Sequence, residues 1–136
     1  MAEKSKKKSI ARYRFKDYQK VAEQFYQAAN DSRMFEYYTA AGVLIVHAAI
    51  AYADALCIKL SGVKSAGDKH EDAITLVESC VADSGDKVKA LNQLSRIIEE
   101  KTRVSYLGEL YTSTQTEEMW KRLERFRKWA LDILQR

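Results

Sequence analysis

The most informative stretch of the chain runs from Arg33 to Leu60, where apolar side chains fill two adjacent rows at helical spacing. Apolar positions that recur every three or four residues mark an amphipathic helix, and two such rows widen the apolar surface around it. One row contains Tyr37, Ala41, Leu44, Ala48, Ala51, Ala55 and Ile58, and the other contains Tyr38, Gly42, Ile45, Ala49, Tyr52 and Leu56. A helix that is apolar on two sides must be enclosed by other helices. The sequence therefore predicts an all-α bundle around residues 33–60.

A first helix is predicted before this central one, over residues 10–29. The polar run 30–32 supplies side chains of the kind that cap a helix start, and Gly62 provides the left-handed residue that commonly follows a helix end. The residues expected to point inward from the first helix are Tyr13, Val21, Phe25 and Ala28.

Three more helices are predicted after Gly62. Residues 68–71 form a variant capping box that begins a short third helix, and residues 83–86 interrupt the chain again. The fourth helix ends near Arg103, and a capping box over residues 114–117 begins the fifth. The fourth helix carries the inward stripe Val88, Leu91, Leu94, Ile97 and Ile98, and the fifth the inward set Trp120, Leu123, Phe126, Ala130, Ile133 and Leu134.

Short connections make consecutive helices antiparallel neighbours, so the expected fold is an up-down bundle of four core helices plus a fifth, C-terminal helix. The 136 residues suit a single domain, predicted over residues 10–136 behind a flexible basic leader of residues 1–9. No β-strand pattern competes with the helices.

Charge is concentrated at the N-terminus. Residues 1–20 carry eight Lys or Arg against two acids, whereas the whole chain has a net charge of only +4. Such a segment either binds polyanions or keeps a flexible end solvated. No apolar run follows residues 6–8, and the charge-free stretch 37–53 is shorter than the ~20 residues of a membrane span. We therefore expect a cytoplasmic protein without a membrane segment.

The chain offers little conventional catalytic or metal-binding chemistry. Cys57 and Cys80 are far apart in the sequence and belong to no Cys/His cluster, which favours reduced thiols over a disulfide or a zinc site. Glycine-rich phosphate loops, HExxH and GxSxG motifs are absent, and only two histidines are present. One of them, His47, is interpreted as a core or interface residue. No metal or cofactor is expected.

Antiparallel helices would bring polar side chains together at one end of the bundle. The residues placed there are Arg12, Arg14, Asp54, His70, Glu71, Lys101, Arg103 and Tyr106. Asp54 lies between two alanines of the most apolar helix, and a buried carboxylate requires a nearby cation. Lys101 or Arg103 is expected to supply that charge, either as part of a binding site or as a structural ion pair that joins two helices.

Four segments, residues 48–56, 67–73, 101–106 and 125–130, resemble by their order and spacing the HEPN superfamily. These are small helical bundles of prokaryotic toxin–antitoxin and defence systems, also found beside minimal nucleotidyltransferases. The resemblance covers residues 40–134. It implies a homodimer, with RNA, a nucleotide, or a cognate nucleotidyltransferase or antitoxin as partner.

Active members of that family are metal-independent ribonucleases with an Arg followed four to six residues later by a His. Arg103 is followed in this region by Gly108, Glu109 and Leu110, so the histidine is missing. The resemblance therefore implies a non-catalytic binding module in which Lys101, Arg103, Arg12 and Arg14 meet phosphate and Tyr106 offers a hydroxyl or a ring. Two alternatives stay open, a degenerate ribonuclease using Arg103 with Glu109 or Tyr106, and a purely structural interaction bundle.

Overall fold

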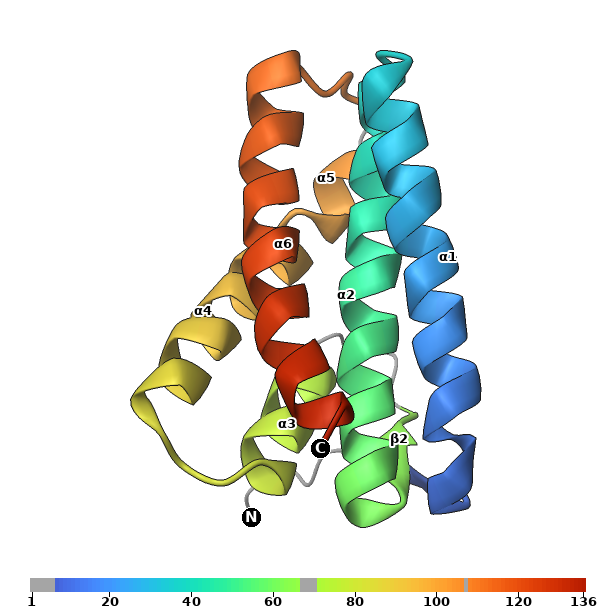
Figure 1. The fold of residues 1–136 in the computed structure, drawn as a ribbon. Coiled ribbons are helices and arrows are strands. Elements are labelled where there is room, and N and C mark those ends of the chain that lie inside the picture. The colour runs from blue at the N-terminus through green and yellow to red at the C-terminus, as the bar shows by residue number, and fades with distance from the viewer. Residues whose placement is uncertain (1–6, 67–70, 107) are drawn as a thin grey trace.

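The protein is an all-α helical bundle, as predicted, with a small two-stranded ribbon at one end (Figure 1). The computed structural model describes residues 7–66, 71–106 and 108–136. Three long helices run side by side along the molecule, and shorter helices complete it behind and below them. The long helices are α1 (Phe15–Met34), α2 (Tyr38–Ser61) and α6 (Ser113–Leu134); the others are α3 (Glu71–Cys80), α4 (Gly85–Glu99) and α5 (Lys101–Tyr106).

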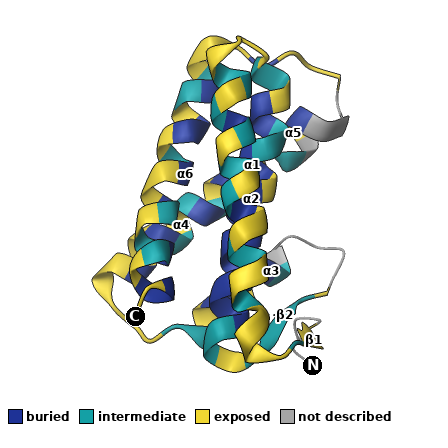
Figure 2. Ribbon diagram, turned by 45° about the vertical axis from the view of Figure 1, so that its right-hand side comes forward, coloured by how far each residue is buried: buried dark blue, intermediate teal, exposed yellow. Residues whose placement is uncertain are grey.

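Helix α2 forms the centre of the core. It contacts α1 and α6 along its length and also α3, α4 and α5. Its small residues, such as Ala48 and Ala55, are fully buried and let the neighbouring helices approach closely. By length and hydropathy α2 resembles a membrane span, but 72% of its most apolar window is buried inside the bundle (Figure 2). This burial is typical of the core helix of a soluble protein.

The turn between α1 and α2 lies later in the sequence than predicted. Residues 30–32 lie inside α1, which continues to Met34, and the reversal occurs at residues 35–37, where Glu36 adopts a φ of 63°. The backbone N–H of Tyr37 donates to the carbonyl of Ser32, which closes the helix end. The predicted capping role of residues 30–32 is therefore wrong, because polar side chains at a helix surface are equally compatible with a continuing helix.

The inward face of α1 is also rotated from its predicted position. Ala22 and Ala29 are fully buried, whereas Tyr13 and Val21 are exposed. Tyr13 precedes α1 and lies in a short 3₁₀ helix, η1 (Arg12–Arg14). Small alanines face α2 because the two long helices approach closely along their whole length.

Helix α4 buries a lysine where the sequence pattern suggested a valine. Val88 is 69% exposed, while the side chain of its neighbour Lys87 is buried. The Lys87 ammonium donates to the carbonyls of Glu78 and Val81 at 2.7 and 2.9 Å, and thereby caps the end of α3. The four other residues of the predicted stripe are buried or half-buried.

Helix α6 begins with a capping box two residues earlier than predicted. The Thr112 hydroxyl accepts from the N–H of Gln115, and the Gln115 side chain accepts from the N–H of Thr112. Thr116, assigned to the predicted box, is instead fully buried and donates its hydroxyl proton to the carbonyl of Thr112 at 2.9 Å. All six residues predicted to point inward from this helix are buried.

The ribbon pairs the beginning of the chain with the segment after α2. Strand β1 (Lys7–Ser9) is antiparallel to β2 (Val63–Ser65), and the N–H of Ile10 donates to the carbonyl of Gly62 at 2.8 Å. Gly62 has a φ of 66° and ends α2, as predicted. Residues 7–9, placed by the sequence in the flexible leader, thus belong to the folded unit because their backbone is paired with β2.

Helix α3 runs in the same direction as α2 rather than against it. It packs against α2 and β2, and its last turn lies at the level of the last turns of α2 (Figure 1). As a consequence, α4 ends near the beginning of α2 and not near its end.

Candidate nucleic-acid interface

The structure divides the predicted polar site between two regions of the bundle. The N–H of Tyr111, just after α5, donates to the Thr39 hydroxyl at 3.0 Å, and Val104 of α5 packs against Gly42. Asp54 lies twelve residues after Gly42, roughly 18 Å farther along α2 at 1.5 Å per residue. The predicted pairing of Asp54 with Lys101 or Arg103 is therefore wrong, because α5, which carries both cations, packs near the beginning of α2.

Arg103 is surrounded by acidic side chains. Its Nε lies 3.6 Å from a carboxylate oxygen of Glu100 and 3.8 Å from one of Glu109. Glu100 also accepts a hydrogen bond from the Tyr111 hydroxyl, whose pKa is raised, chiefly by burial. Arg103 and Glu109, which the ribonuclease alternative uses together, thus lie near each other, but two neighbouring carboxylates weaken the attraction of this guanidinium for phosphate. His70 and the side chains of Glu71 and Tyr106 lie outside the described residues.

Asp54 shares the opposite end of the bundle with Arg12 and Arg14. Burial raises the pKa of its carboxyl to about 6, and this effect is opposed by the Lys64 ammonium and by a hydrogen bond from the Ser65 backbone. The cation beside Asp54 thus comes from β2, which the sequence did not predict.

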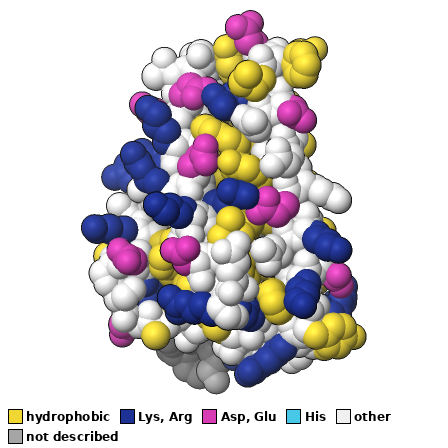
Figure 3. Space-filling model, in the orientation of Figure 1, with side chains coloured by type: hydrophobic (Ala, Val, Ile, Leu, Met, Phe, Trp, Pro, Cys, Tyr) yellow, Lys and Arg dark blue, Asp and Glu magenta, His cyan; other side chains and the backbone are white. Residues whose placement is uncertain are grey.

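Seven cationic residues gather at this end, and we call them the basic pole. They come from the ribbon, η1 and the first turns of α1: Lys7, Lys8, Arg12, Arg14, Lys16, Lys20 and Lys64. All except the half-buried Lys64 are exposed. In Figure 3, Lys and Arg side chains occupy the lower right, where Figure 1 places η1 and the start of α1. Among the described residues, acids near these cations include Asp17, which pairs with Arg14 at 3.6 Å, and the half-buried Asp54.

Two lysines of the basic pole are held directly opposite one another. Lys8 of β1 is the register partner of Lys64 in β2, so both side chains extend from the same face of the ribbon. Opposed like charges destabilise a strand pair unless an anion neutralises them. The fold therefore holds positive charge close together at this face.

Aromatic side chains are interleaved with these cations. The Tyr18 ring is approached by the Arg14 guanidinium at 5.7 Å and by the Lys64 ammonium at 5.2 Å. Tyr13, between Arg12 and Arg14, is 77% exposed and leaves its ring accessible to a ligand. Cations that alternate with an accessible ring are typical of surfaces that bind single-stranded nucleic acid.

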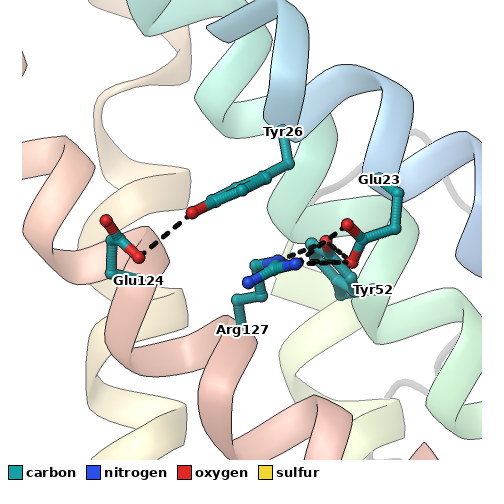
Figure 4. Close-up of polar contacts among 5 residues, drawn as sticks. All are labelled: Glu23, Tyr26, Tyr52, Glu124 and Arg127. Atoms are coloured by element: carbon teal, nitrogen blue, oxygen red, sulfur yellow. Dashed lines mark hydrogen bonds and ion pairs between the residues drawn. The ribbon is translucent and has the colours of Figure 1, made fainter. Parts of the chain in front are cut away.

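A second polar cluster lies in the middle of the bundle between α1, α2 and α6 (Figure 4). The buried Tyr52 hydroxyl donates to Glu23 and accepts from the Nε of Arg127 at 2.8 Å. The Nη2 of Arg127 donates to both carboxylate oxygens of Glu23, at 2.8 and 3.0 Å. Tyr26 lies beside them and donates to Glu124 at 3.2 Å. These groups satisfy one another, so the cluster joins the three long helices and leaves no group directed at a ligand.

The described surface also contains a cavity of about 540 Å³ between α4 and α6. Arg125 and Lys128 line it together with Asp86 and Asp132, and Trp129 contributes an apolar wall. Lys89 adds a third cation, so three cations face two acids around this cavity, a much smaller excess of positive charge than at the basic pole. Within the described ranges, no group of three or more His, Cys, Asp or Glu residues is placed to hold a metal ion.

The sequence predicted part of the basic pole and missed the rest. Arg12 lies beside Gly62 at the end of α2, the end of the bundle where Arg12 and Arg14 were expected, whereas Lys64 and Tyr13 were not expected to belong to a cationic surface. The only local signal was the alternation of cations and tyrosine in Arg12–Arg14, because the pairing of Lys8 with Lys64 is a long-range contact. His47 is exposed and stacks on Phe25 at 5.5 Å, so it is not a core residue.

No family model, curated protein or solved structure matches the chain.

Proposed function

We propose that the protein is a non-catalytic, HEPN-like helical bundle that binds single-stranded RNA at the basic pole. The observation that carries the proposal is the opposition of Lys8 and Lys64 across the ribbon. Lys64 already lies near Asp54 and the Tyr18 ring, and the exposed Lys8 opposite it adds a second positive charge on the same face of the ribbon, so a phosphate bound there would be attracted by both side chains.

The remaining groups of the pole extend this contact in two ways. Arg12 and Arg14 present guanidinium groups that bind phosphate oxygens in a bidentate manner. Tyr13 is placed between them with most of its ring exposed, so a base can stack on it. Single-stranded RNA supplies both the charged backbone that the arginines would bind and the unstacked bases that Tyr13 would stack on.

Fluorescence anisotropy with a labelled single-stranded RNA, measured over a series of salt concentrations, tests the proposal. Replacing Lys8, Arg12 and Lys64 together by Gln should lower the slope of log affinity against log salt by about 2, since each lost phosphate contact on a single strand removes about 0.7. Tyr13→Ala should weaken binding by roughly five- to a hundredfold with little change in that slope, because stacking contributes ~1–3 kcal/mol per base.

A charge-matched control separates site binding from general attraction. Lys89, Lys121 and Lys128 are exposed cations on α4 and α6, away from the pole. Their joint replacement by Gln changes the net charge equally and should leave the slope nearly unchanged. Equal losses in both triple variants, or no binding of the unaltered protein at low salt, would contradict the proposal.

A degenerate ribonuclease is the second candidate, favoured by the proximity of Arg103 and Glu109. In that mechanism Glu109 would accept the proton of a ribose 2′-hydroxyl and Arg103 would stabilise the phosphate. Incubation of RNA with the unaltered protein and with Arg103→Ala decides it, because cleavage by this site must disappear in the variant.

Partner binding belongs to the same proposal. Met34, Phe35 and Tyr37 at the turn between α1 and α2 are each more than 60% exposed. An apolar turn of this kind is a surface for a second copy or a cognate nucleotidyltransferase or antitoxin. Size-exclusion chromatography with light scattering should give a dimer mass for the unaltered protein, and Phe35→Ser should shift it toward the monomer.

A further inference from the structure

The cavity between α4 and α6 combines charges of both signs with an aromatic wall. Its volume of about 540 Å³ lies within the range of small-molecule sites. Figure 3 shows Lys, Arg, Asp and Glu side chains over these two helices, at the left of the view. The aromatic wall is Trp129, which is half-buried and packs against Phe126 with 5.8 Å between the ring centroids. The charged residues that line the cavity are Asp86 and Lys89 of α4 and Arg125, Lys128 and Asp132 of α6.

These five charged side chains keep their hydrogen-bonding capacity. All five are exposed, and none of them makes a hydrogen bond or an ion pair with any residue that the structure describes. Asp86 and Lys89 are three residues apart in α4, a spacing that favours pairing on a helix. Glu100 and Arg103 have the same order and spacing, and they do pair, with 3.6 Å between the Arg103 Nε and a Glu100 carboxylate oxygen. The charges around the cavity are therefore available to a ligand.

We propose that this cavity binds a free α-amino acid with an aromatic side chain. Such a ligand carries one carboxylate, one ammonium and one ring, and the walls of the cavity offer a partner for each. The Arg125 guanidinium can hold the carboxylate through two parallel hydrogen bonds, and the two lysines add positive charge beside it. The two aspartates attract the ammonium, and the ring packs on Trp129 in an offset or edge-to-face arrangement. A zwitterion is the kind of ligand that uses both signs of charge.

The amino-acid site is separate from the basic pole. RNA is a polyanion that the two acids of the cavity repel, whereas the pole has a large excess of positive charge. The proposal does not depend on RNA binding. The variant in which Lys8, Arg12 and Lys64 are replaced by Gln should bind the amino acid as tightly as the unaltered protein does.

Isothermal titration calorimetry of the full chain with L-phenylalanine tests the proposal. Two analogues each lack one charged group, since phenylpropionate has no ammonium and phenethylamine has no carboxylate. L-Phenylalanine should bind roughly tenfold or more tightly than either analogue, because each of its charged groups gains a charge-assisted hydrogen bond in the cavity.

Substitutions of the two kinds of charge should have opposite effects on the analogues. Replacing Asp86 and Asp132 together by Asn should weaken the binding of L-phenylalanine and phenethylamine by roughly tenfold or more, without weakening that of phenylpropionate. Arg125→Gln should weaken the binding of L-phenylalanine and phenylpropionate by a similar factor, without weakening that of phenethylamine. All three positions are exposed, so these variants retain the folded core.

Tryptophan fluorescence shows whether the ligand lies in the cavity. The chain has two tryptophans, and Trp129 lines the cavity whereas the buried Trp120 does not. Trp129→Phe preserves an aromatic wall, so the heat of binding should remain while the fluorescence change on adding L-phenylalanine disappears. Three results would overturn the proposal: no heat of binding up to about 10 mM L-phenylalanine, equally tight binding of L-phenylalanine and phenylpropionate, or a fluorescence change that persists in Trp129→Phe.

Discussion

Replacing Asp54 by asparagine should stabilise the protein at neutral pH and have a much smaller effect in mild acid. Burial raises the pKa of the Asp54 carboxyl from 3.8 to about 6, despite the opposing effects of Lys64 and the Ser65 N–H. The native state therefore holds the Asp54 proton more tightly than the unfolded state does. This contribution to stability is complete below pH 3.8 and is lost as the pH rises to about 6. Above this range the charged carboxylate remains as a net cost.

The magnitude follows from the size of the shift. About two pKa units correspond to roughly 3 kcal/mol at pH 7.5 and to roughly 1 kcal/mol at pH 4.5, where the unfolded chain is largely ionised and the native carboxyl is protonated. The asparagine side chain would be neutral at both pH values and would still accept a hydrogen bond from Ser65 through its amide oxygen. The Asp54→Asn gain in unfolding free energy should therefore be about threefold larger at pH 7.5 than at pH 4.5.

Urea denaturation followed by circular dichroism at the two pH values measures this difference directly. Asp132→Asn, at an exposed position of α6, is the control that removes a carboxylate without altering a buried group. The reasoning is refuted if Asp54→Asn destabilises the protein at pH 7.5, or if its effect is as large at pH 4.5. Either result would mean that Lys64 holds the carboxylate in its ionised form.

Three further predictions concern individual side chains. Lys87→Met should lower the unfolding free energy by about 3 kcal/mol in urea denaturation, because it leaves the carbonyls of Glu78 and Val81, at the end of α3, without their ammonium donor. Tyr52→Phe should cost about 1 kcal/mol, since the Glu23–Arg127 ion pair remains. The rate of Cys80 alkylation by iodoacetamide, followed by mass spectrometry, should reach half its plateau near pH 6 rather than near pH 9.

The fold class was predictable because the pattern in α2 is unambiguous. A helix with buried positions on nearly every side, such as the consecutive residues Ala51, Tyr52 and Ala53, has to lie at the centre of a bundle. The direction of α3 was not predictable in the same way. It depends on the pairing of β2 with β1, and no local pattern in Val63–Ser65 specifies a partner more than fifty residues earlier. Because α3 runs in the opposite direction to the predicted one, the residues of the predicted polar site do not come together.

Helix boundaries and faces show a second limit of local patterns. The sequences at Thr112–Gln115 and Thr114–Glu117 both satisfy the capping-box pattern, and the choice between them depends on the burial of Thr116 against Tyr38. Lys87 is a similar case, because its long alkyl stem fits an apolar face while its ammonium reaches carbonyls at the end of α3. A pattern that classes lysine only as polar selects the neighbouring Val88 instead.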